Sequence, residues 1–281
     1  MKNKYIIGIT VVTVLCVIIG TMYHVVGLGW SDGDSRTERI EVREADGGQT
    51  VDSAGSWRLD PFDSIKIDAD ILELWIGEGD GGYIEYECTK GLDPTCEVKD
   101  GVLYVRQNAK KTWTLFGVNN NNAELRVTVP RGTDLGTIDI EIDVGNIELD
   151  GLKATRCDIE ASVGNIEISA CTFDACGFDS DTGNVVVEDA ALGNASCSSA
   201  VGNVELRDCT FGNLKIEADI GDTRVRAAQT LADYDIDLEL DLGDVTVNGR
   251  REGTRYSAKG TGGYRMEISS DMGNISVDYE E

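Results

Sequence analysis

Short segments of alternating apolar and polar residues fill the second half of the chain, and one small motif recurs between them. The motif has six positions. The first is an aliphatic residue or threonine, the second is glycine, and the third is asparagine or aspartate. A β-branched residue, any residue and an aliphatic residue follow in that order. Its glycine and the next residue occur at Gly145-Asn146, Gly164-Asn165, Gly183-Asn184, Gly202-Asn203, Gly221-Asp222, Gly243-Asp244 and Gly273-Asn274. The spacing from Gly145 to Gly221 is constant, and the last two intervals are longer. A fixed period of about 19 residues indicates one structural unit stacked on copies of itself.

Within a unit, residues 147–149 and 157–161 alternate apolar and polar side chains, as strands with one buried face do. One coil cannot bury its apolar face alone, whereas stacked coils bury it between parallel strands about 4.8 Å apart. We therefore predict an all-β fold, a parallel β-solenoid (β-helix) with coils of about 19 residues. The pattern leaves open the handedness and whether two or three strands form each coil.

The glycine and the polar residue after it are predicted to form the corner of each coil. Glycine adopts positive φ without steric cost, and a short asparagine or aspartate side chain can bond its own backbone there. These positions are therefore expected to be structural turns and not ligand-binding residues.

Four sets of apolar positions repeat with the coils and are predicted to point into the core. Two residues after each glycine come Ile147, Ile166, Val185, Val204, Thr223, Val245 and Ile275. Four residues after it come Leu149, Ile168, Val187, Leu206, Val225, Val247 and Val277. Fourteen residues after the glycine come Ile159, Phe178, Cys197 and Ile216. Directly before it come Val144, Val163, Thr182, Val201, Ile220, Leu242 and Met272.

The N-terminal part divides into an apolar segment, a polar tether and a less regular β region. Residues 5–28 are almost wholly apolar and long enough to span a bilayer. Lys2 and Lys4 precede them, which favours a cytoplasmic tail at 1–4, a transmembrane helix at 5–28 and an external body. A cleaved signal peptide is the rival interpretation, but no small-x-small cleavage site follows the segment. We expect a signal-anchor, a tether at 29–60 with one strand at 39–42, a β cap at 61–122 and the repeat solenoid at 123–281.

The chain is acidic, with 51 Asp and Glu against 25 Lys and Arg and a net charge of −26. This excludes nucleic acid as an expected partner, because phosphate binding needs a cationic surface. One expected outward row contains Glu141, Glu160, Asp179, Ser198 and Glu217, and a second contains Asp143, Ser162, Asp181, Ala200 and Asp219. We expect solvent and salt to screen these charges, with no bound cofactor; weak Ca²⁺ binding is the alternative.

Five cysteines are predicted to be small buried hydrophobes, because Cys157, Cys171, Cys176, Cys197 and Cys209 fall at inward positions of the repeat. Cys171 and Cys209 lie two coils apart, about 9.5 Å, which is too far for a disulfide. Cys88 and Cys96 flank a turn with glycine and proline, so a disulfide between them is left open.

No catalytic or metal-binding residue is predicted. The one histidine, His24, lies in the apolar segment, which removes histidine-dependent triads and most zinc sites. A polysaccharide-acting enzyme on such a fold would need long insertions around a cleft, and the central coils have none. We therefore expect a protein that is not an enzyme, with the polysaccharide-acting enzyme as a remote alternative.

Two segments interrupt the regular pattern and are candidates for contact with a ligand or partner. The first, 107–122, contains Lys110, Lys111, Trp113 and Phe116, which are expected to touch a partner or the membrane, or to cover the solenoid end. The second, between the last two motif glycines, contains Arg250, Arg251, Arg255, Lys259 and Arg265. It is expected to be a capping loop, with a glycan- or anion-binding spot as the alternative.

From about Asp60 onward the chain resembles the bacterial "putative adhesin" family of β-strand-repeat proteins, a Gram-positive envelope type with a domain of unknown function. The matching features are residues 61–67, the strand at 125–130 and the recurring Val-Gly-Asn-Ile motif. The resemblance implies a protein of the bacterial cell membrane, single-pass, with its C-terminal domain extracytoplasmic. The strict coils, the lack of histidine and the absent cleft favour a binding or scaffolding role, with an envelope protein, a cell-wall polymer or further copies of the chain as the expected partners. Because some members are encoded beside envelope-stress signalling systems, the alternative is an accessory component of envelope-stress sensing that binds a membrane signalling partner.

Overall fold

The computed structural model describes residues 53–89, 91–109 and 123–279. These residues contain 22 strands and one short 3₁₀ helix at Leu231–Asp233, and all belong to the second of two compact units, Gly48–Glu281. The predicted tail, transmembrane helix and most of the tether, including the strand at 39–42, lie outside the described residues. Within the described ranges, no helix has the length and apolar character needed to cross a membrane.

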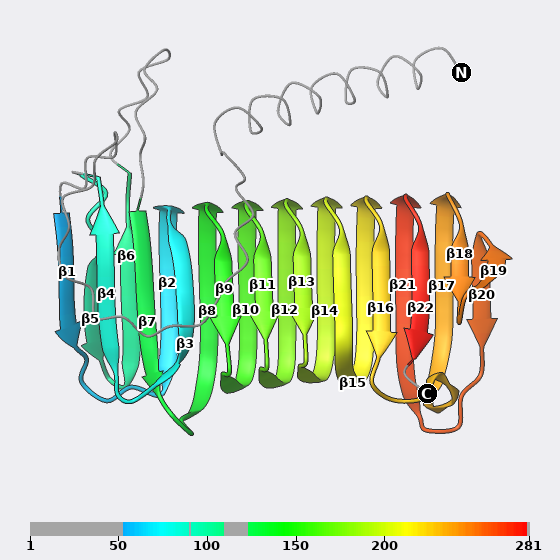
Figure 1. The fold of residues 1–281 in the computed structure, drawn as a ribbon, viewed down its shortest axis with the longest axis horizontal. Coiled ribbons are helices and arrows are strands. Elements are labelled where there is room, and N and C mark those ends of the chain that lie inside the picture. Colours follow the sequence, from blue (N-terminus) through cyan, green and yellow to red (C-terminus); the bar gives the residue numbers. More distant parts are fainter. Residues whose placement is uncertain (1–52, 90, 110–122, 280–281) are drawn as a thin grey trace, which may run out of the picture. The chain divides into compact units, whose positions relative to one another are not determined.

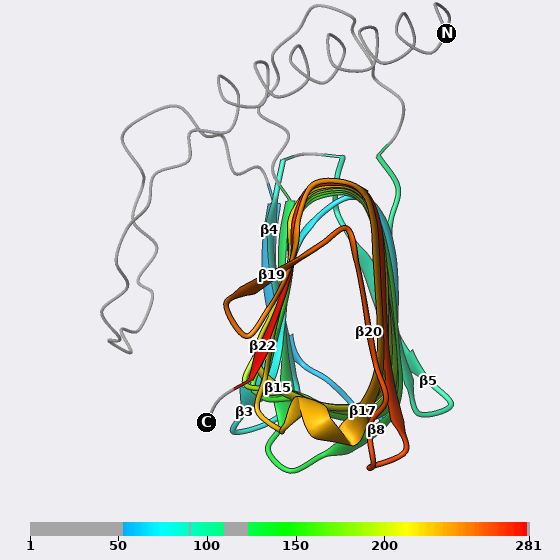
Figure 2. The same cartoon turned by 90° about the vertical axis from the view of Figure 1, so that its right-hand side faces the viewer.

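The described part of this unit is a stack of flattened coils, each of which contributes one strand to each of two sheets (Figures 1 and 2). The central coils alternate short strands in sheet A with long strands in sheet B. In chain order they are β8 (Asp134–Val144), β9 (Ile147–Asp150), β10 (Lys153–Val163), β11 (Ile166–Ser169), β12 (Thr172–Thr182), β13 (Val185–Glu188), β14 (Ala191–Val201), β15 (Val204–Ile220) and β16 (Thr223–Ala227). Strand β15 runs through both sheets, because its first part pairs with β13 and its second part with β14. Two strands per coil therefore answer the question that the pattern left open.

The pairing is parallel and in register with the repeat. Ile166 pairs with Ile147 on one side and Val185 on the other, each one period away, and Ile159 pairs with Ile140 and Phe178. The same row positions therefore recur along the stack, and the predicted parallel solenoid is the architecture observed.

Every motif glycine has positive φ, between 142° and 152°. A Cβ on Gly164 would lie 1.9 Å from the carbonyl oxygen of Gly145 in the neighbouring coil, which leaves no space for a side chain. The asparagine after the glycine was predicted to bond its own backbone, and this prediction was wrong. Asn146 Oδ1 accepts a hydrogen bond from the backbone N–H of Asn165 at 2.8 Å, and not from its own backbone.

This amide contact repeats along the whole stack as a side-chain ladder. Its members, in spatial order, are Glu73, Asn146, Asn165, Asn184, Asn203, Asp222, Asn274 and Asp244. Each side-chain oxygen accepts from the backbone N–H of the next member, over 2.8–3.3 Å. The ladder therefore joins each coil to the next at the corner that the glycine forms.

The spatial order of the coils differs from the chain order at both ends of the stack. Strands β21 (Tyr264–Met272) and β22 (Ile275–Tyr279) insert between β15–β16 and the earlier strands β17 (Tyr234–Leu242) and β18 (Val245–Val247). At the other end, β2 (Ser64–Ile71) and β3 (Glu73–Gly79) lie between β8–β9 and the later strands β6 (Val102–Gln107) and β7 (Ala123–Pro130). Strand pairing thus crosses residue 122, where the boundary between cap and solenoid was expected.

Antiparallel strands close the sheets at both ends. In sheet A, β4 (Tyr83–Cys88) pairs with β7, β1 (Ser53–Arg58) pairs with β4, and β19 (Arg250–Gly253) pairs with β18. In sheet B, β5 (Thr95–Lys99) pairs with β6, and β20 (Arg255–Ala258) pairs with β17. The segment after Gly243 therefore has the capping role expected of it, as strands and not as a loop.

Three of the four predicted inward rows form the core, and the fourth is wrong. Ile147, Leu149 and Ile159 are at most 1% exposed, as are most of their row partners. In the row directly before the glycines, however, Val144 is 45%, Met272 47% and Leu242 61% exposed. The chain turns at the glycine, so the preceding side chain points out of the bend. Period-two alternation does not reveal this reversal.

Candidate functional site

The outer face of sheet B has rows of exposed carboxylates in register on neighbouring strands. Glu141, Glu160 and Asp179 are successive rungs, Asp68 precedes them, and Glu217 follows after one serine rung. Neighbouring rungs are about 4.8 Å apart, so like charges face each other along the row. In the described part of the chain, no group of three or more acidic, histidine or cysteine side chains is arranged to hold a metal ion. Weak Ca²⁺ binding stays a prediction.

Basic residues on the same face are paired with neighbouring carboxylates. Lys66 pairs with Asp139, and Lys215 Nζ lies 2.9 Å from Glu217 Oε1. The hydrogen bond that Lys66 donates to Asp139 is the main cause that raises the pKa of Lys66. The face is therefore a mixed but predominantly negative surface, hereafter the carboxylate face.

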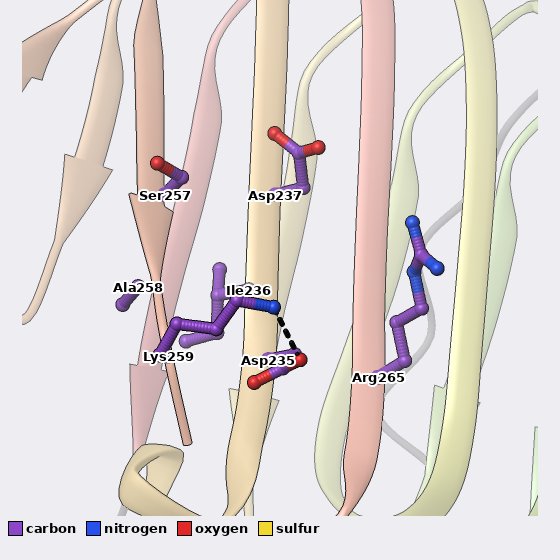
Figure 3. A pocket seen from close by; sticks show the side chains of 7 residues that line it. All are labelled: Asp235, Ile236, Asp237, Ser257, Ala258, Lys259 and Arg265. Atoms are coloured by element: carbon purple, nitrogen blue, oxygen red, sulfur yellow. Dashed lines mark hydrogen bonds and ion pairs between the residues drawn. The ribbon is translucent and has the colours of Figure 1, made fainter.

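A hollow of about 250 Å³ lies beside β17 and β20 and is lined by Asp235, Asp237, Ser257, Lys259 and Arg265 among others (Figure 3). Lys259 Nζ lies 2.6 Å from Asp235 Oδ2, and the backbone N–H of Gly260 donates to Asp235 Oδ1 at 3.0 Å. The bond from Lys259 is the larger of the causes that hold the pKa of Asp235 below its usual value. This hollow presents both signs of charge to solvent.

A second hollow of about 390 Å³ adjoins it, and Arg265 lines both. Its lining includes the polar side chains of Asn194, Ser196 and Asn213 beside the apolar Ala195 and Leu214. Asn213 Nδ2 donates to Asn194 Oδ1 at 2.8 Å, and Asn213 Oδ1 accepts from the backbone N–H of Arg265 at 3.1 Å. Amides, hydroxyls and charged groups of this kind can bond a hydroxyl-rich ligand.

The predicted basic cluster does not form one site, because two of its residues are in sheet A and three are in or beside sheet B. Each one pairs with a carboxylate: Arg250 with Glu252, Arg251 with Asp244, Arg255 with Glu239, Lys259 with Asp235 and Arg265 with Glu267. Lys259 and Arg265 line one hollow. All five positive charges are thus paired with carboxylates where they lie.

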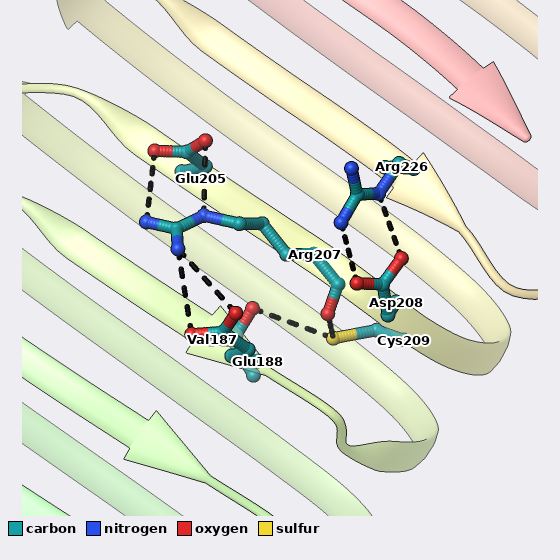
Figure 4. A network of polar contacts seen from close by, with 7 residues as sticks. All are labelled: Val187, Glu188, Glu205, Arg207, Asp208, Cys209 and Arg226. Carbon is teal, nitrogen blue, oxygen red and sulfur yellow. Dashed lines mark hydrogen bonds and ion pairs between the residues drawn. The ribbon is translucent and has the colours of Figure 1, made fainter.

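Ion pairs on the outer face of sheet A form a network that the sequence analysis missed (Figure 4). Arg207 Nε lies 3.1 Å from Glu205, and its Nη1 lies 3.4 Å from Glu188. Arg226 Nε donates to Asp208 at 2.7 Å, and this bond is the main cause that lowers the pKa of Asp208. Glu188 and Arg207 occupy the same position in successive repeats, a pattern that could have revealed stacked charges of opposite sign. The network joins coils.

The predicted contact residues Lys110, Lys111, Trp113 and Phe116 lie outside the described residues. The described residue before them, Ala109, donates its backbone N–H to Asp70 Oδ2 at 2.8 Å. The described residue after them, Ala123, pairs with Cys88. Both flanking residues therefore belong to the first coils of the stack.

The five cysteines of the repeat are buried thiols, as predicted: Cys157, Cys171, Cys176, Cys197 and Cys209. Burial raises the pKa of Cys171, Cys176 and Cys197 to about 12. Cys96 is also a free thiol, so the disulfide with Cys88 that was left open is not formed in the structure. These thiols are protonated and packed, and they lack the features of reactive cysteines.

Comparison with known proteins assigns the family. The family model described as Toastrack DUF4097 matches residues 62–248, and the chain belongs to this family. No curated protein matches the chain.

Several solved structures are similar at low sequence identity. A "putative cell adhesion protein" from Clostridium sporogenes is 15% identical and covers 81% of this chain and 99% of its own, with a TM-score of 0.39. A "putative adhesin" from Bacteroides fragilis is 12% identical and covers 80% and 96%, with a TM-score of 0.46. A "putative lipid binding protein" from Parabacteroides distasonis is 17% identical and covers 82% and 96%, with a TM-score of 0.40.

Proposed function

We propose that the protein is a membrane-anchored, extracytoplasmic β-solenoid with a binding or scaffolding role at the bacterial cell envelope. The observation that carries the proposal is the carboxylate face, where Glu141, Glu160 and Asp179 repeat in register on successive coils. A surface that repeats about every 4.8 Å offers many equivalent weak contacts to a polymer or an extended partner. The apolar segment 5–28, preceded by Lys2 and Lys4, supports the anchor.

The test compares the full-length protein with a face variant that carries Glu141→Gln, Glu160→Gln and Asp179→Asn. Binding to purified cell-wall polymer is measured with and without Ca²⁺, because a divalent cation can bridge carboxylates on both partners. We expect about tenfold weaker retention by the face variant. Equal retention of both proteins would contradict a role for this face, and release of sugar or peptide fragments by the wild type would replace binding with hydrolysis.

A second candidate function is an accessory role in envelope-stress sensing, through Lys110, Lys111, Trp113 and Phe116. The observation that favours it is the position of both flanking residues in the first coils, with Ala109 bonded to Asp70. Replacement of Trp113 and Phe116 by serine should abolish an envelope-stress response while thermal unfolding stays unchanged. An unchanged response would end this alternative.

A further inference from the structure

A mostly aliphatic row, with one threonine, follows the outer corner where each coil turns from sheet B into sheet A. In spatial order its members are Ile71, Val144, Val163, Thr182, Val201, Ile220, Met272 and Leu242, and we call this row the aliphatic ridge. Its eight rungs span about 34 Å at the usual strand spacing. Leu242, Met272 and Val144 are exposed, and the other five are partly exposed. Contiguous exposed apolar surface of this kind marks an interaction site.

The fold alone does not explain the aliphatic character of the ridge. Thr182 occupies one rung and keeps regular pairing with Val163 and Val201, so a hydroxyl is compatible with the stack. Strand preference favours valine, isoleucine and threonine, but it does not favour the leucine and methionine at the most exposed rungs. An exposed Leu242 and Met272 are better explained by contact with another molecule.

Charge determines which kind of molecule fits the ridge. A parallel row on its sheet B side carries exposed aspartates, with Ser162 and Ala200 at two intervening rungs. The aspartates are Asp143, Asp181, Asp219, Asp271 and Asp241. None of the five forms an ion pair with another described residue. On the other side runs the amide ladder, where Asp222 and Asp244 are neutralised by Arg224 and Arg251. The ridge therefore has an uncompensated negative border along one side.

We propose that the aliphatic ridge is a docking surface for a cationic amphipathic helix of a partner protein. The apolar face of such a helix would cover the ridge, while its lysines or arginines would reach the aspartate row. A helix rises about 5.4 Å per turn, close to the spacing of the rungs, and about 18 residues make a helix about 27 Å long. A second copy docked ridge to ridge would bring two aspartate rows together, and an anionic membrane surface would repel them.

The experiment uses the full-length protein in phosphatidylcholine nanodiscs, with empty nanodiscs as the blank. The probe is a fluorescent peptide of about 18 leucines and lysines whose leucines lie on one helical face. The ridge variant carries Val163→Thr, Val201→Thr, Met272→Gln and Leu242→Gln, which leave every charge in place. The face variant described above serves as the matched control, because it removes three carboxylates from the same sheet and leaves the ridge intact.

We expect the ridge variant to bind the peptide about tenfold or more weakly, and the face variant to bind it within about threefold of the wild type. A scrambled peptide of the same composition should also bind about tenfold more weakly than the amphipathic one. Equal binding by the ridge variant would overturn the proposal, as would loss of binding confined to the face variant. Concentration-dependent dimers of the wild type that the ridge variant lacks would assign the ridge to a second copy instead. The carboxylate face is a different surface, so the two proposals can fail separately.

Discussion

The side-chain oxygen of Asn146 accepts a hydrogen bond from the backbone N–H of Asn165 at 2.8 Å, and the two residues are one repeat apart. A side chain at one corner thus satisfies a backbone group of the next coil. The same relation repeats to Asn184, Asn203 and beyond, so one interaction defines the register at each corner.

Removal of one rung of this ladder should weaken the stack by the cost of one hydrogen bond. We expect Asn184→Ala to lower the free energy of unfolding by about 0.5–1.5 kcal/mol, because the N–H of Asn203 loses its acceptor. Asn184→Asp keeps an acceptor at the same place and should cost less. Urea denaturation of the three proteins measures the difference, and equal stability of Asn184→Ala and wild type would show that water replaces the bond.

A side chain at a motif glycine should be far more damaging. A Cβ on Gly183 would lie 1.8 Å from the carbonyl oxygen of Gly164, at a φ of 151°. Gly183→Ala should therefore cost about 3 kcal/mol or more. Gly132 also has positive φ but nothing within 4 Å of its Cβ position, so Gly132→Ala is the matched control, with an expected cost of about 1 kcal/mol. Similar losses for both variants would mean that φ, and not the neighbouring coil, sets the cost.

Repulsion between the charges of the carboxylate row should lower the stability of the fold, and salt should reduce that effect. Glu160 lies between Glu141 and Asp179 in register, so Glu160→Gln removes two repulsive contacts between like charges. We expect Glu160→Gln to raise the free energy of unfolding by about 0.2–1 kcal/mol at low ionic strength. The melting temperature should rise slightly as a result. The gain should shrink at about 1 M salt, where screening is strong. A melting temperature that falls at low salt would indicate that the row binds a stabilising cation.

The buried thiols make stability sensitive to alkaline pH. Burial raises the pKa of Cys197 to about 12 from an ordinary value near 9. The folded state therefore holds a proton that the unfolded state releases, so stability is complete below about pH 9 and falls as pH rises from about 9 towards 12. Replacement of Cys197 by valine should reduce that slope in melting curves, and an unchanged slope would place the sensitivity in other groups.

The spatial order of the last coils can be tested with engineered disulfides. Ser269 pairs in register with both Glu217 and Glu239, so Ser269→Cys should form a disulfide with Glu217→Cys. The pair Glu217→Cys and Glu239→Cys would be two strands apart, about 9.6 Å, beyond bonding distance. Non-reducing electrophoresis after oxidation distinguishes the two pairs. Bridging of the second pair alone would restore the chain order and contradict the structure.

The repeat predicted much of the fold because its rows are local in sequence. Ile147 and Ile166 are related by one period, and their pairing and burial follow from it. The order of the end coils could not be predicted, because the motifs at Gly221, Gly243 and Gly273 are similar enough to stack in more than one spatial order. The exposure of Val144 and Leu242 was missed because strand alternation does not describe a side chain at the turn. For the functional surfaces, the carboxylate rows were visible as a period, whereas the hollow that Lys259 and Arg265 share depends on β20, which no repeat predicts.

Because the spatial order of the last coils is inverted, β21 and β22 connect the end strands β17 and β18 to the rest of the stack. Strands β17 to β20 are translated first, yet their parallel pairing to the rest of the stack runs only through β21 and β22 in the described structure. Until those two strands emerge, β15 and β16 present an open edge, and the capping strands have nothing to close. A ribosome that stalls near residue 260, or a protease that removes the residues beyond it, would leave the edges of β15 and β16 unpaired. The emergence of β21 and β22 is thus the step that protects the edge from aggregation.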